Sequence, residues 1–297
     1  MKRLRVDVVS LLKELEIVIK MLINTKVTSK YRSVYKGKGL EFEDYRVYTP
    51  EDDASRIDWK ASARTNDTLI KVFREERNLN VYILLDTSSS MIFGSTKKLK
   101  MEYAAELAAA FSYFILDAND RVSVLMFNDK IAKMIPPGVG KRHFYVILNS
   151  LVNAELYGGG FDLKKAINFV MKTSKERGLM IIISDFINVK GDWEKDLKIA
   201  AAKFDIIGVR VRDPRDEAMP DDDVGQIVLQ SPFASDSALV DPRKIADAYK
   251  KRVQAEDNRI ETAFLKSRID LMKLSTADSF IKPLVEFFLI RRKWSWR

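Results

Sequence analysis

Apolar runs of strand length alternate with helix-spaced apolar positions from Asn78 onward. The runs predict strands at residues 79–85, 121–127, 130–135, 179–184 and 204–210. Helical spacing predicts helices at residues 98–117, 141–152, 163–176 and 193–203. Such alternation is typical of an α/β fold, with a mostly parallel sheet flanked by helices on both faces.

The remaining C-terminal segments follow a different order. A turn-rich acidic stretch after Arg212 precedes a predicted hairpin at 226–240, a long charged helix at 242–267, a strand at 269–273 and a last helix at 278–292. Pro136-Pro137-Gly138 is predicted to form a turn. We therefore expect one α/β domain over residues 79–297, with a C-terminal helical extension.

Two further regions precede this domain. Residues 1–28 contain an amphipathic helix over 5–24, which packs on the domain, lies on a membrane or binds a partner helix. Residues 29–78 are polar, aromatic and rich in turn signals, which favours an accessory region of short strands and loops. Within it, residues 53–63 have the pattern of a short capped helix.

Composition narrows the function classes. The chain of 297 residues is 46% hydrophobic and has no cysteine, so disulfides and thiolate metal sites are excluded. Its longest apolar stretch, residues 6–23, is interrupted by charges and is not expected to span a bilayer, so we expect a cytoplasmic protein. The net charge of +9 favours acidic proteins, nucleic acid or anionic lipid as partners. The basic, aromatic end of the chain and the first helix leave peripheral membrane contact open.

Side-chain oxygens recur at alternate positions where the strand 79–85 ends, in Asp86, Ser88 and Ser90. Ligand sites collect at the carboxyl ends of strands in open α/β sheets, and magnesium takes carboxylate and hydroxyl oxygens. The apolar strand that ends at Asp185 is expected beside the first strand, which would bring a second carboxylate to the same place. The alternative is that Asp86 and the serines only satisfy backbone amides of the turn.

The D-x-S-x-S element resembles the metal-ion-dependent adhesion site of von Willebrand factor A-type domains. The resemblance implies a von Willebrand A-like, Rossmann-type fold and a Mg²⁺ ion whose open position takes a partner's carboxylate. That family also supplies a threonine from a Gly-Gly-Thr-Asp-Leu-like loop, where this chain has Phe161 within Gly158–Leu163. Phenylalanine is no ligand, so either Asp162 turns inward, a water takes the place, or the site is metal-free.

Residues 35–77 resemble the signature of the domain-of-unknown-function family fifty-eight. That pattern contains G-x-G-x-E-F, R-x-Y, D-D, I-D-W, S-A-R and an F-x-E-E-R-like run before the D-x-S-x-S element. The matching residues are Gly37, Gly39, Glu41, Phe42, Arg46, Tyr48, Asp52, Asp53, Arg56, Ile57, Asp58, Trp59, Ser62, Ala63, Arg64, Phe73, Glu75, Glu76 and Arg77. One departure is Glu51, where the family has glycine.

Arginines and carboxylates alternate through this signature, which suits bidentate ion pairs. One interpretation is an ion-pair network that fixes the accessory region, and the other is a face that docks a partner. The candidate docking residues are Arg46, Asp52, Asp53, Arg56, Asp58, Trp59 and Arg64.

No catalytic set is recognisable, and we expect a protein that is not an enzyme and has no small-molecule substrate. The single histidine, His143, lies within a predicted amphipathic helix, and no spacing brings it to Ser88 or Ser90. The glycines at 37–39 and 158–160 match no phosphate-binding loop.

Proteins of family fifty-eight resemble partners of MoxR-type AAA+ ATPases. The resemblance therefore implies a non-enzymatic adaptor or co-chaperone that binds a MoxR-type ATPase or its client through an adhesion-like metal site. The alternative is an RNA- or DNA-binding protein that uses its basic surface.

Overall fold

A computed structural model gives the structure of the protein. It describes residues 4, 40–65, 67–75, 79–189, 191–220, 224–284 and 286. The chain divides into two compact units, one of residues 29–79 and the other of the remaining residues. The helix predicted over 5–24 lies outside the described residues.

A six-stranded sheet forms the centre of the larger unit. Its strands are β3 (Asn80–Asp86), β4 (Arg121–Phe127), β5 (Ile131–Gly138), β6 (Gly178–Ser184), β7 (Phe204–Arg212) and β10 (Asp270–Ser275). The spatial order is β10-β7-β6-β3-β4-β5, and only β5 runs antiparallel to its neighbour. This is the doubly wound order, which reverses direction at β3, and it confirms the predicted α/β class.

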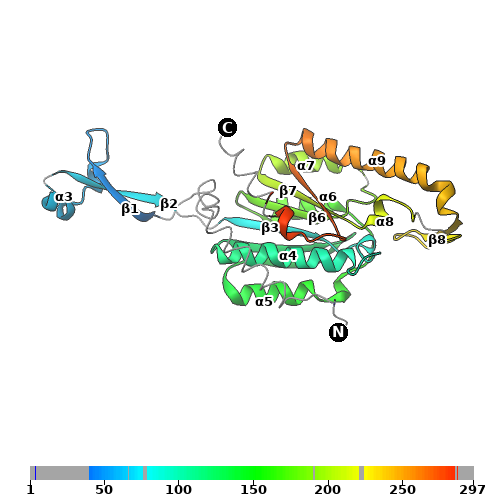
Figure 1. Ribbon diagram of the computed structural model, residues 1–297. Coiled ribbons are helices and arrows are strands. Elements are labelled where there is room, and N and C mark those ends of the chain that lie inside the picture. Colours follow the sequence, from blue (N-terminus) through cyan, green and yellow to red (C-terminus); the bar gives the residue numbers. More distant parts are fainter. Residues whose placement is uncertain are drawn as a thin grey trace. The chain divides into compact units, whose positions relative to one another are not determined.

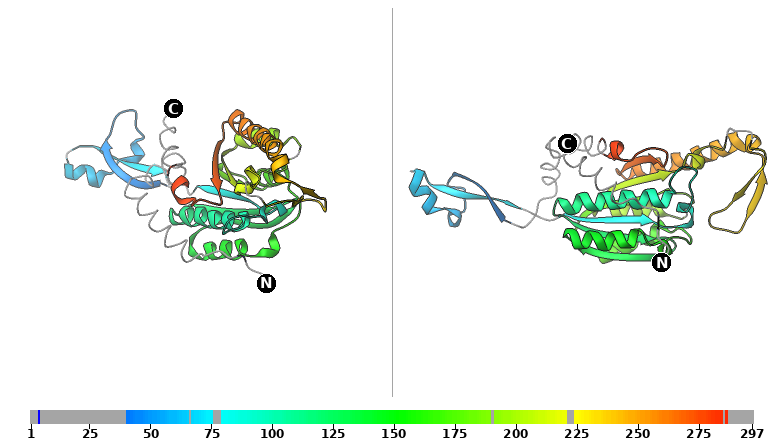
Figure 2. Two further views of the ribbon diagram at one scale, coloured as in Figure 1. Left: turned by 45° about the vertical axis from the view of Figure 1, so that its right-hand side comes forward. Right: turned by 60° about the horizontal axis from the view of Figure 1, so that its bottom comes forward.

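Helices cover both faces of this sheet. They are α4 (Lys100–Asp117), α5 (Gly140–Leu151), α6 (Leu163–Thr173), α7 (Trp193–Ala201), α8 (Pro214–Glu217) and α9 (Pro242–Lys266), with 3₁₀ turns η2 (Ser89–Met91) and η3 (Ala154–Leu156). Helices α4 and α5 lie on one face, while α6, α7 and α9 lie on the other (Figure 1). Two further views show the same division (Figure 2).

Alternation along the strands explains why both faces are apolar. Successive side chains of a strand point to opposite faces, so Tyr82 and Leu84 belong to the cluster under α6, α7 and α9. All seven residues of β3 and of β6 are buried. In that cluster Phe264 of α9 lies over Gly208 of β7, where a Cβ atom would stand 2.2 Å from the phenylalanine ring. Glycine at this position therefore lets α9 approach the sheet closely.

The residues Pro136-Pro137-Gly138 were predicted to form a turn, and this prediction is wrong. They continue β5, whose register pairs Ile135 with Val124 and Gly138 with Val122. The prolines stand where the register with β4 shifts, between the pairs Val124–Ile135 and Val122–Gly138, and a bulge in an edge strand tolerates residues without an N–H. The turn comes after the strand, at Gly140, whose φ is +79°.

A two-stranded hairpin, β8 (Ile227–Gln230) and β9 (Ser237–Val240), precedes α9 and lies at the N-terminal end of that helix (Figure 2). Val228 pairs with Leu239 across it, and both are more than 60% exposed. Of the predicted last helix, residues 281–284 are helical, and most of the rest lies outside the described residues.

The smaller unit consists of an antiparallel pair and two short helical turns. Its elements are β1 (Leu40–Val47), η1 (Ala54–Arg56), α3 (Trp59–Thr65) and β2 (Leu69–Glu75). Ile57 bridges to Ile70, which is 3% exposed and lies at the centre of this unit. The short helix predicted over 53–63 is thus two separate turns, each preceded by a capping aspartate.

Candidate functional site

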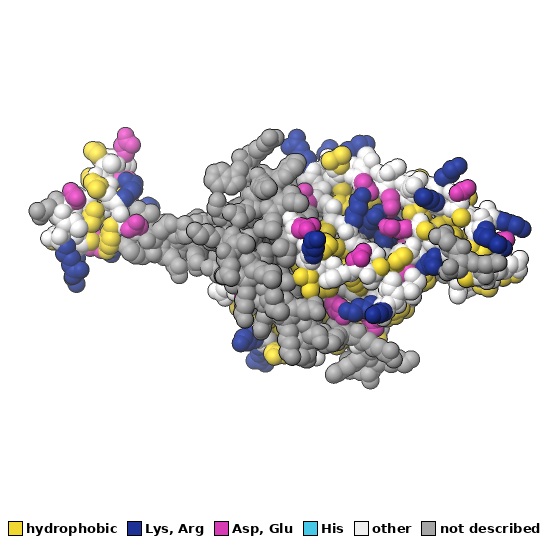
Figure 3. Space-filling model, in the orientation of Figure 1, with side chains coloured by type: hydrophobic (Ala, Val, Ile, Leu, Met, Phe, Trp, Pro, Cys, Tyr) yellow, Lys and Arg dark blue, Asp and Glu magenta, His cyan; other side chains and the backbone are white. Residues whose placement is uncertain are grey.

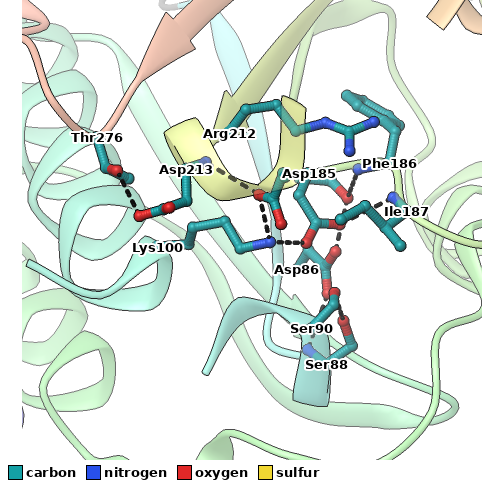
Figure 4. A network of polar contacts seen from close by, with 12 residues as sticks. Asp86, Ser88, Ser90, Lys100, Asp185, Phe186, Ile187, Arg212, Asp213 and Thr276 are labelled. Atoms are coloured by element: carbon teal, nitrogen blue, oxygen red, sulfur yellow. Dashed lines mark hydrogen bonds and ion pairs between the residues drawn. The ribbon is translucent and has the colours of Figure 1, made fainter. Parts of the chain in front are cut away.

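Strand β3 ends at the buried carboxylate of Asp86, and the following loop folds back over it. One Asp86 oxygen accepts a hydrogen bond from the Ser88 backbone N–H at 2.8 Å. The other accepts one from the Ser184 hydroxyl at 2.6 Å. The hydroxyl oxygens of Ser88 and Ser90 are 3.1 Å apart (Figure 4). Three predicted oxygen ligands therefore gather in one place, but all three residues are at most 2% exposed.

Asp185 follows the neighbouring strand. Strand β6 pairs in parallel with β3, with Ile183 beside Leu85, which confirms that the strand ending before Asp185 lies next to the first strand. Asp185 is fully buried. Burial, together with the nearby Asp185 carboxylate, raises the pKa of Asp86 to about 7.

The ammonium group of Lys100, in the first turn of α4, partners Asp185. Its nitrogen lies 2.7 Å from an Asp185 oxygen and 2.8 Å from an Asp216 oxygen, and the residue is 1% exposed. Figure 4 shows this ammonium pointing at the Asp185 carboxylate. Burial alone would raise the pKa of Asp185, but Lys100 and then Arg212 hold that pKa below its ordinary value. Asp185 is therefore an ionised carboxylate whose charge is matched from within the protein.

Asp213 joins this cluster to the loop after η2. Its carboxylate accepts from the Ser95 backbone N–H at 2.7 Å and the Ser95 hydroxyl at 2.5 Å. It also accepts from the hydroxyl of Thr276 at 3.1 Å and from the backbone of Arg215 at 2.9 Å. One carboxylate thus ties the loop, α8 and the end of β10 together.

The glycine loop lies against the same turn. Gly158 and Gly159 have φ angles of +122° and +86°, which residues with a side chain rarely adopt. Gly158 donates to the Thr87 carbonyl at 2.7 Å, and the Ser89 N–H donates to the Gly159 carbonyl at 3.0 Å. The glycine loop is therefore bonded directly to the backbone of the D-x-S-x-S turn.

Phe161 and Asp162, which leave this loop, both have structural partners. The Phe161 ring packs on Phe127 with centroids 5.9 Å apart, against the core. The Asp162 carboxylate caps α6 by accepting from the Lys165 N–H at 2.8 Å, and it also pairs with the Lys165 ammonium at 3.6 Å. Neither side chain supplies the missing ligand.

These placements do not fit a magnesium ion in the form that the sequence predicts. Asp162 caps a helix, Asp185 is held by an ammonium, and only the oxygens of Asp86, Ser88 and Ser90 remain together. Among the residues that the structure describes, no three Asp, Glu or His side chains form a cluster suited to a metal. Magnesium binding itself stays a prediction.

A family model matches most of the chain. Residues 44–259 match the model of the family described as "Protein of unknown function DUF58". The chain belongs to this family. The resemblance drawn from the 35–77 signature is thereby confirmed.

Proteins similar to this DUF58 chain include two uncharacterized mycobacterial proteins. An uncharacterized protein of Mycobacterium tuberculosis, Rv1480, is 27% identical over 289 residues, covering 95% of this chain and 89% of that protein. An uncharacterized protein of Mycobacterium avium, MAV169, is 28% identical over 139 residues, covering 44% of this chain and 77% of that protein.

Solved structures similar to the DUF58 chain include von Willebrand A-type domains. The protein BatB from Bacteroides thetaiotaomicron has a TM-score of 0.44 at 15% identity, covering 73% of this chain and 99% of that one. The SpRpn10 VWA domain has a TM-score of 0.41 at 12% identity, covering 71% and 95%. Nothing about ligands or partners follows from likenesses of this size. The fold itself is α/β, with a mostly parallel sheet and one antiparallel edge strand.

Most of the candidate docking residues of the DUF58 signature are bonded within the smaller unit. Arg46 forms a two-pronged ion pair with Asp52. Asp58 caps α3, accepts from the Tyr45 hydroxyl at 2.9 Å and pairs with Lys71 at 3.0 Å. Asp53 caps η1. These residues hold the unit's own framework.

The other three candidate docking residues are Trp59, Arg56 and Arg64. Trp59, in the first position of α3, is 71% exposed, and Arg56 and Arg64 are exposed on either side of it in sequence. A large exposed aromatic residue flanked by guanidinium groups is the composition of a binding hot spot.

His143 lies at the opposite end of the sheet from the D-x-S-x-S loop. Its Nε2 is 2.7 Å from the carbonyl oxygen of Val122, near the start of β4. Asp86 pairs with Phe127 at the other end of that strand. The five residue steps from Val122 to Phe127 span about 16 Å at the usual strand rise, so no Ser–His pair forms.

Sequence reasoning missed the residues that surround the predicted site: Ser184, Lys100, Asp213 and Asp216. One signal was present for Lys100, which shares a helical face with Tyr103, Leu107 and Phe111. The polar segment around Asp213 carries no periodicity from which burial follows.

Two exposed apolar side chains follow the buried D-x-S-x-S loop. Ile92 and Phe93, directly after η2, are 44% and 43% exposed. The Phe93 carbonyl accepts from the Lys100 N–H at 2.8 Å, which fixes the loop to the start of α4. As for membranes, no helix within the described ranges has the length and apolarity needed to cross one.

Proposed function

We propose that this protein is a non-enzymatic adaptor or co-chaperone that binds a protein partner at the carboxyl edge of its six-stranded sheet. The observation that carries the proposal is the exposed pair Ile92 and Phe93, which stands directly after the buried D-x-S-x-S loop.

The loop that presents this pair is held on both sides. Ser95 is bonded twice to Asp213, and Lys100 is bonded through its backbone to Phe93. Rigid presentation lowers the ordering cost of binding, because the loop is already in place. Exposed apolar groups on a rigid loop therefore suit a docking role better than a packing role.

A second contact is the exposed trio Trp59, Arg56 and Arg64 of the smaller unit. Its guanidinium groups, and the net charge of +9 of the whole chain, are complementary to an acidic partner surface. The partner that the family resemblance implies is a MoxR-type AAA+ ATPase or its client.

The test is a pull-down of a purified MoxR-type ATPase with the full chain. We expect the double variant Ile92→Ser, Phe93→Ser to lose at least ten-fold in affinity. The control Ile199→Ser changes an apolar residue of α7 that is 51% exposed, and it should bind as the unaltered chain does. Equal binding by all three proteins would show that the partner does not bind at the carboxyl edge of the sheet. Chelation in the same assay tests the metal-bridged version that the sequence predicts.

Nucleic-acid binding is the competing function, and the net charge of +9 is the observation that favours it. On the face drawn in Figure 3, basic side chains are interspersed with acidic ones, which supports protein binding instead. Binding to mixed RNA or duplex DNA whose affinity falls steeply with salt would favour the competing function. Liposome co-sedimentation tests membrane contact.

A further inference from the structure

Lys100 occupies an unusual position for a lysine. Side chains of this type are almost never fully buried without a partner, and this one is 1% exposed. Its ammonium is within 2.8 Å of carboxylates from two different segments, Asp185 after β6 and Asp216 in α8. It also lies 5.7 Å from the ring centroid of Phe93. One cation thus joins three segments of the carboxyl edge.

One of those segments, the end of β6 with Asp185, belongs to the set of oxygens predicted to hold a divalent ion. The D-x-S-x-S loop leads into α4, which carries Lys100, and Asp185 ends the neighbouring strand. Asp185 has already given one oxygen to the ammonium and the other to the Ile187 N–H at 2.9 Å. A divalent ion in contact with Asp185 would stand beside a fixed like charge, which opposes its binding.

The position of the ammonium is fixed by the start of α4. The Leu99 N–H donates to the Glu102 carboxylate at 3.0 Å, and the Lys100 N–H donates to the Phe93 carbonyl. The helix face that carries Lys100 continues with Tyr103 and Leu107, which are buried. The side chain is therefore directed into the cluster by the same packing that holds the helix.

We propose that the ammonium of Lys100 takes the place of the divalent cation in this adhesion-like site. It neutralises Asp185 and Asp216, ties the start of α4 to α8 and to the end of β6, and makes Asp185 unavailable to magnesium. A consequence, which rests on the proposed function, is that partner binding at this edge needs no metal.

The first experiment titrates the full unaltered chain with Mn²⁺, and free Mn²⁺ is followed by its electron paramagnetic resonance signal. We expect no saturable binding up to about 1 mM, above the range of intracellular sensor sites. One Mn²⁺ bound per chain, and lost in Asp86→Asn, would overturn the proposal. Because the unaltered chain is titrated, the result does not depend on whether a variant folds.

The second experiment removes the charge at nearly constant size, with Lys100→Met. We expect its Tm to fall by roughly 10 °C, since breaking a buried pair from one side leaves uncompensated charge. Adding Asp185→Asn to this variant should recover part of the loss. The control Lys273→Met removes an ammonium that is 48% exposed and pairs with Glu261, which is 40% exposed, and it should shift Tm by less than about 3 °C. A Lys100→Met variant as stable as the control would contradict the proposal.

The third experiment repeats the MoxR-type pull-down with EDTA. Equal binding with and without chelator supports a metal-free edge, and loss of binding in EDTA opposes it. If no partner binds under either condition, the proposed function fails, while the Mn²⁺ and Tm results still decide the role of Lys100.

Discussion

Asp213 accepts two hydrogen bonds from Ser95, although 118 residues separate them in the chain. Asp213 stands just after β7, and Ser95 lies in the loop that carries the exposed Ile92 and Phe93. The buried polar cluster and the surface above it are therefore one structural unit.

Removing this link is expected to loosen the loop. Asp213→Ala leaves the donors of Ser95 and Thr276 without their acceptor and removes the cap of α8, so we expect about 3 kcal/mol less stability in urea unfolding. Asp241→Ala, which removes the cap of α9 at an exposed position, is the control and should cost about 1 kcal/mol. Similar losses in the two variants would mean that Asp213 is an ordinary cap.

The close approach of α9 to the sheet makes Gly208 sensitive to a single methyl group. In Gly208→Ala the new Cβ would stand 2.2 Å from a ring carbon of Phe264, which is 1% exposed. Overpacking of this kind costs about 1–3 kcal/mol. Chemical unfolding of Gly208→Ala, of Phe264→Leu and of the double variant tests this contact. The double variant should lose less free energy of unfolding than the two single variants lose together, because the smaller Leu side chain makes room for the new methyl group. Simple additivity would contradict the contact.

The smaller unit should loosen in acid. A hydrogen bond from Arg46 lowers the pKa of Asp52 to about 2, and one from Lys71 does the same for Asp58. Both values lie below the unfolded value near 3.9, so the stabilisation is present above about pH 4 and is lost as pH falls toward 2. Hydrogen exchange of residues 40–65, corrected for intrinsic rates, should show declining protection in that window.

The variants Asp52→Asn and Asp58→Asn are expected to flatten that pH dependence. Asp67→Asn, at an exposed carboxylate of the same unit, is the control and should leave it unchanged. Identical pH profiles for all of these proteins would show that the two ion pairs do not stabilise the unit.

Trp59 should matter for binding and not for stability. Its side chain is 71% exposed, so the Tm of Trp59→Ala should stay within about 2 °C of that of the unaltered chain. The affinity of this variant for the MoxR-type partner should fall by about ten-fold or more. Val47→Ala, at a residue of the same unit that is 55% exposed, is the control for a general loss of apolar surface. Unchanged affinity in Trp59→Ala would remove this residue from the proposed docking surface.

The sequence was sufficient for the sheet because its strands are continuous apolar runs. The strands over 79–85 and 179–184 are buried on both faces, so their sequences are largely apolar runs that are easily recognised. Their adjacency followed from the doubly wound pattern. Pro136 and Pro137 misled because prolines usually end strands, whereas an edge strand tolerates them.

The site was only half predictable. The alternate spacing of Asp86, Ser88 and Ser90 after an apolar strand predicts their place in the site. The run of three glycines predicts the loop that lies against them. Lys100 shares a helical face with the buried Tyr103 and Leu107, but it also ends the run Lys97-Lys98-Leu99-Lys100, which has the pattern of a solvated face. Its partners Asp185 and Asp216 lie 85 and 116 residues away, so the burial of its charge depends on tertiary contacts that local pattern does not encode.

The prolines of β5 have a consequence for assembly. A strand that lacks two amide hydrogens cannot serve as a template for a further strand along that stretch, so the sheet is protected there against edge-to-edge aggregation. A partner that recognises this protein by adding a strand to the sheet would find its amide donors and acceptors along β10, at the opposite margin.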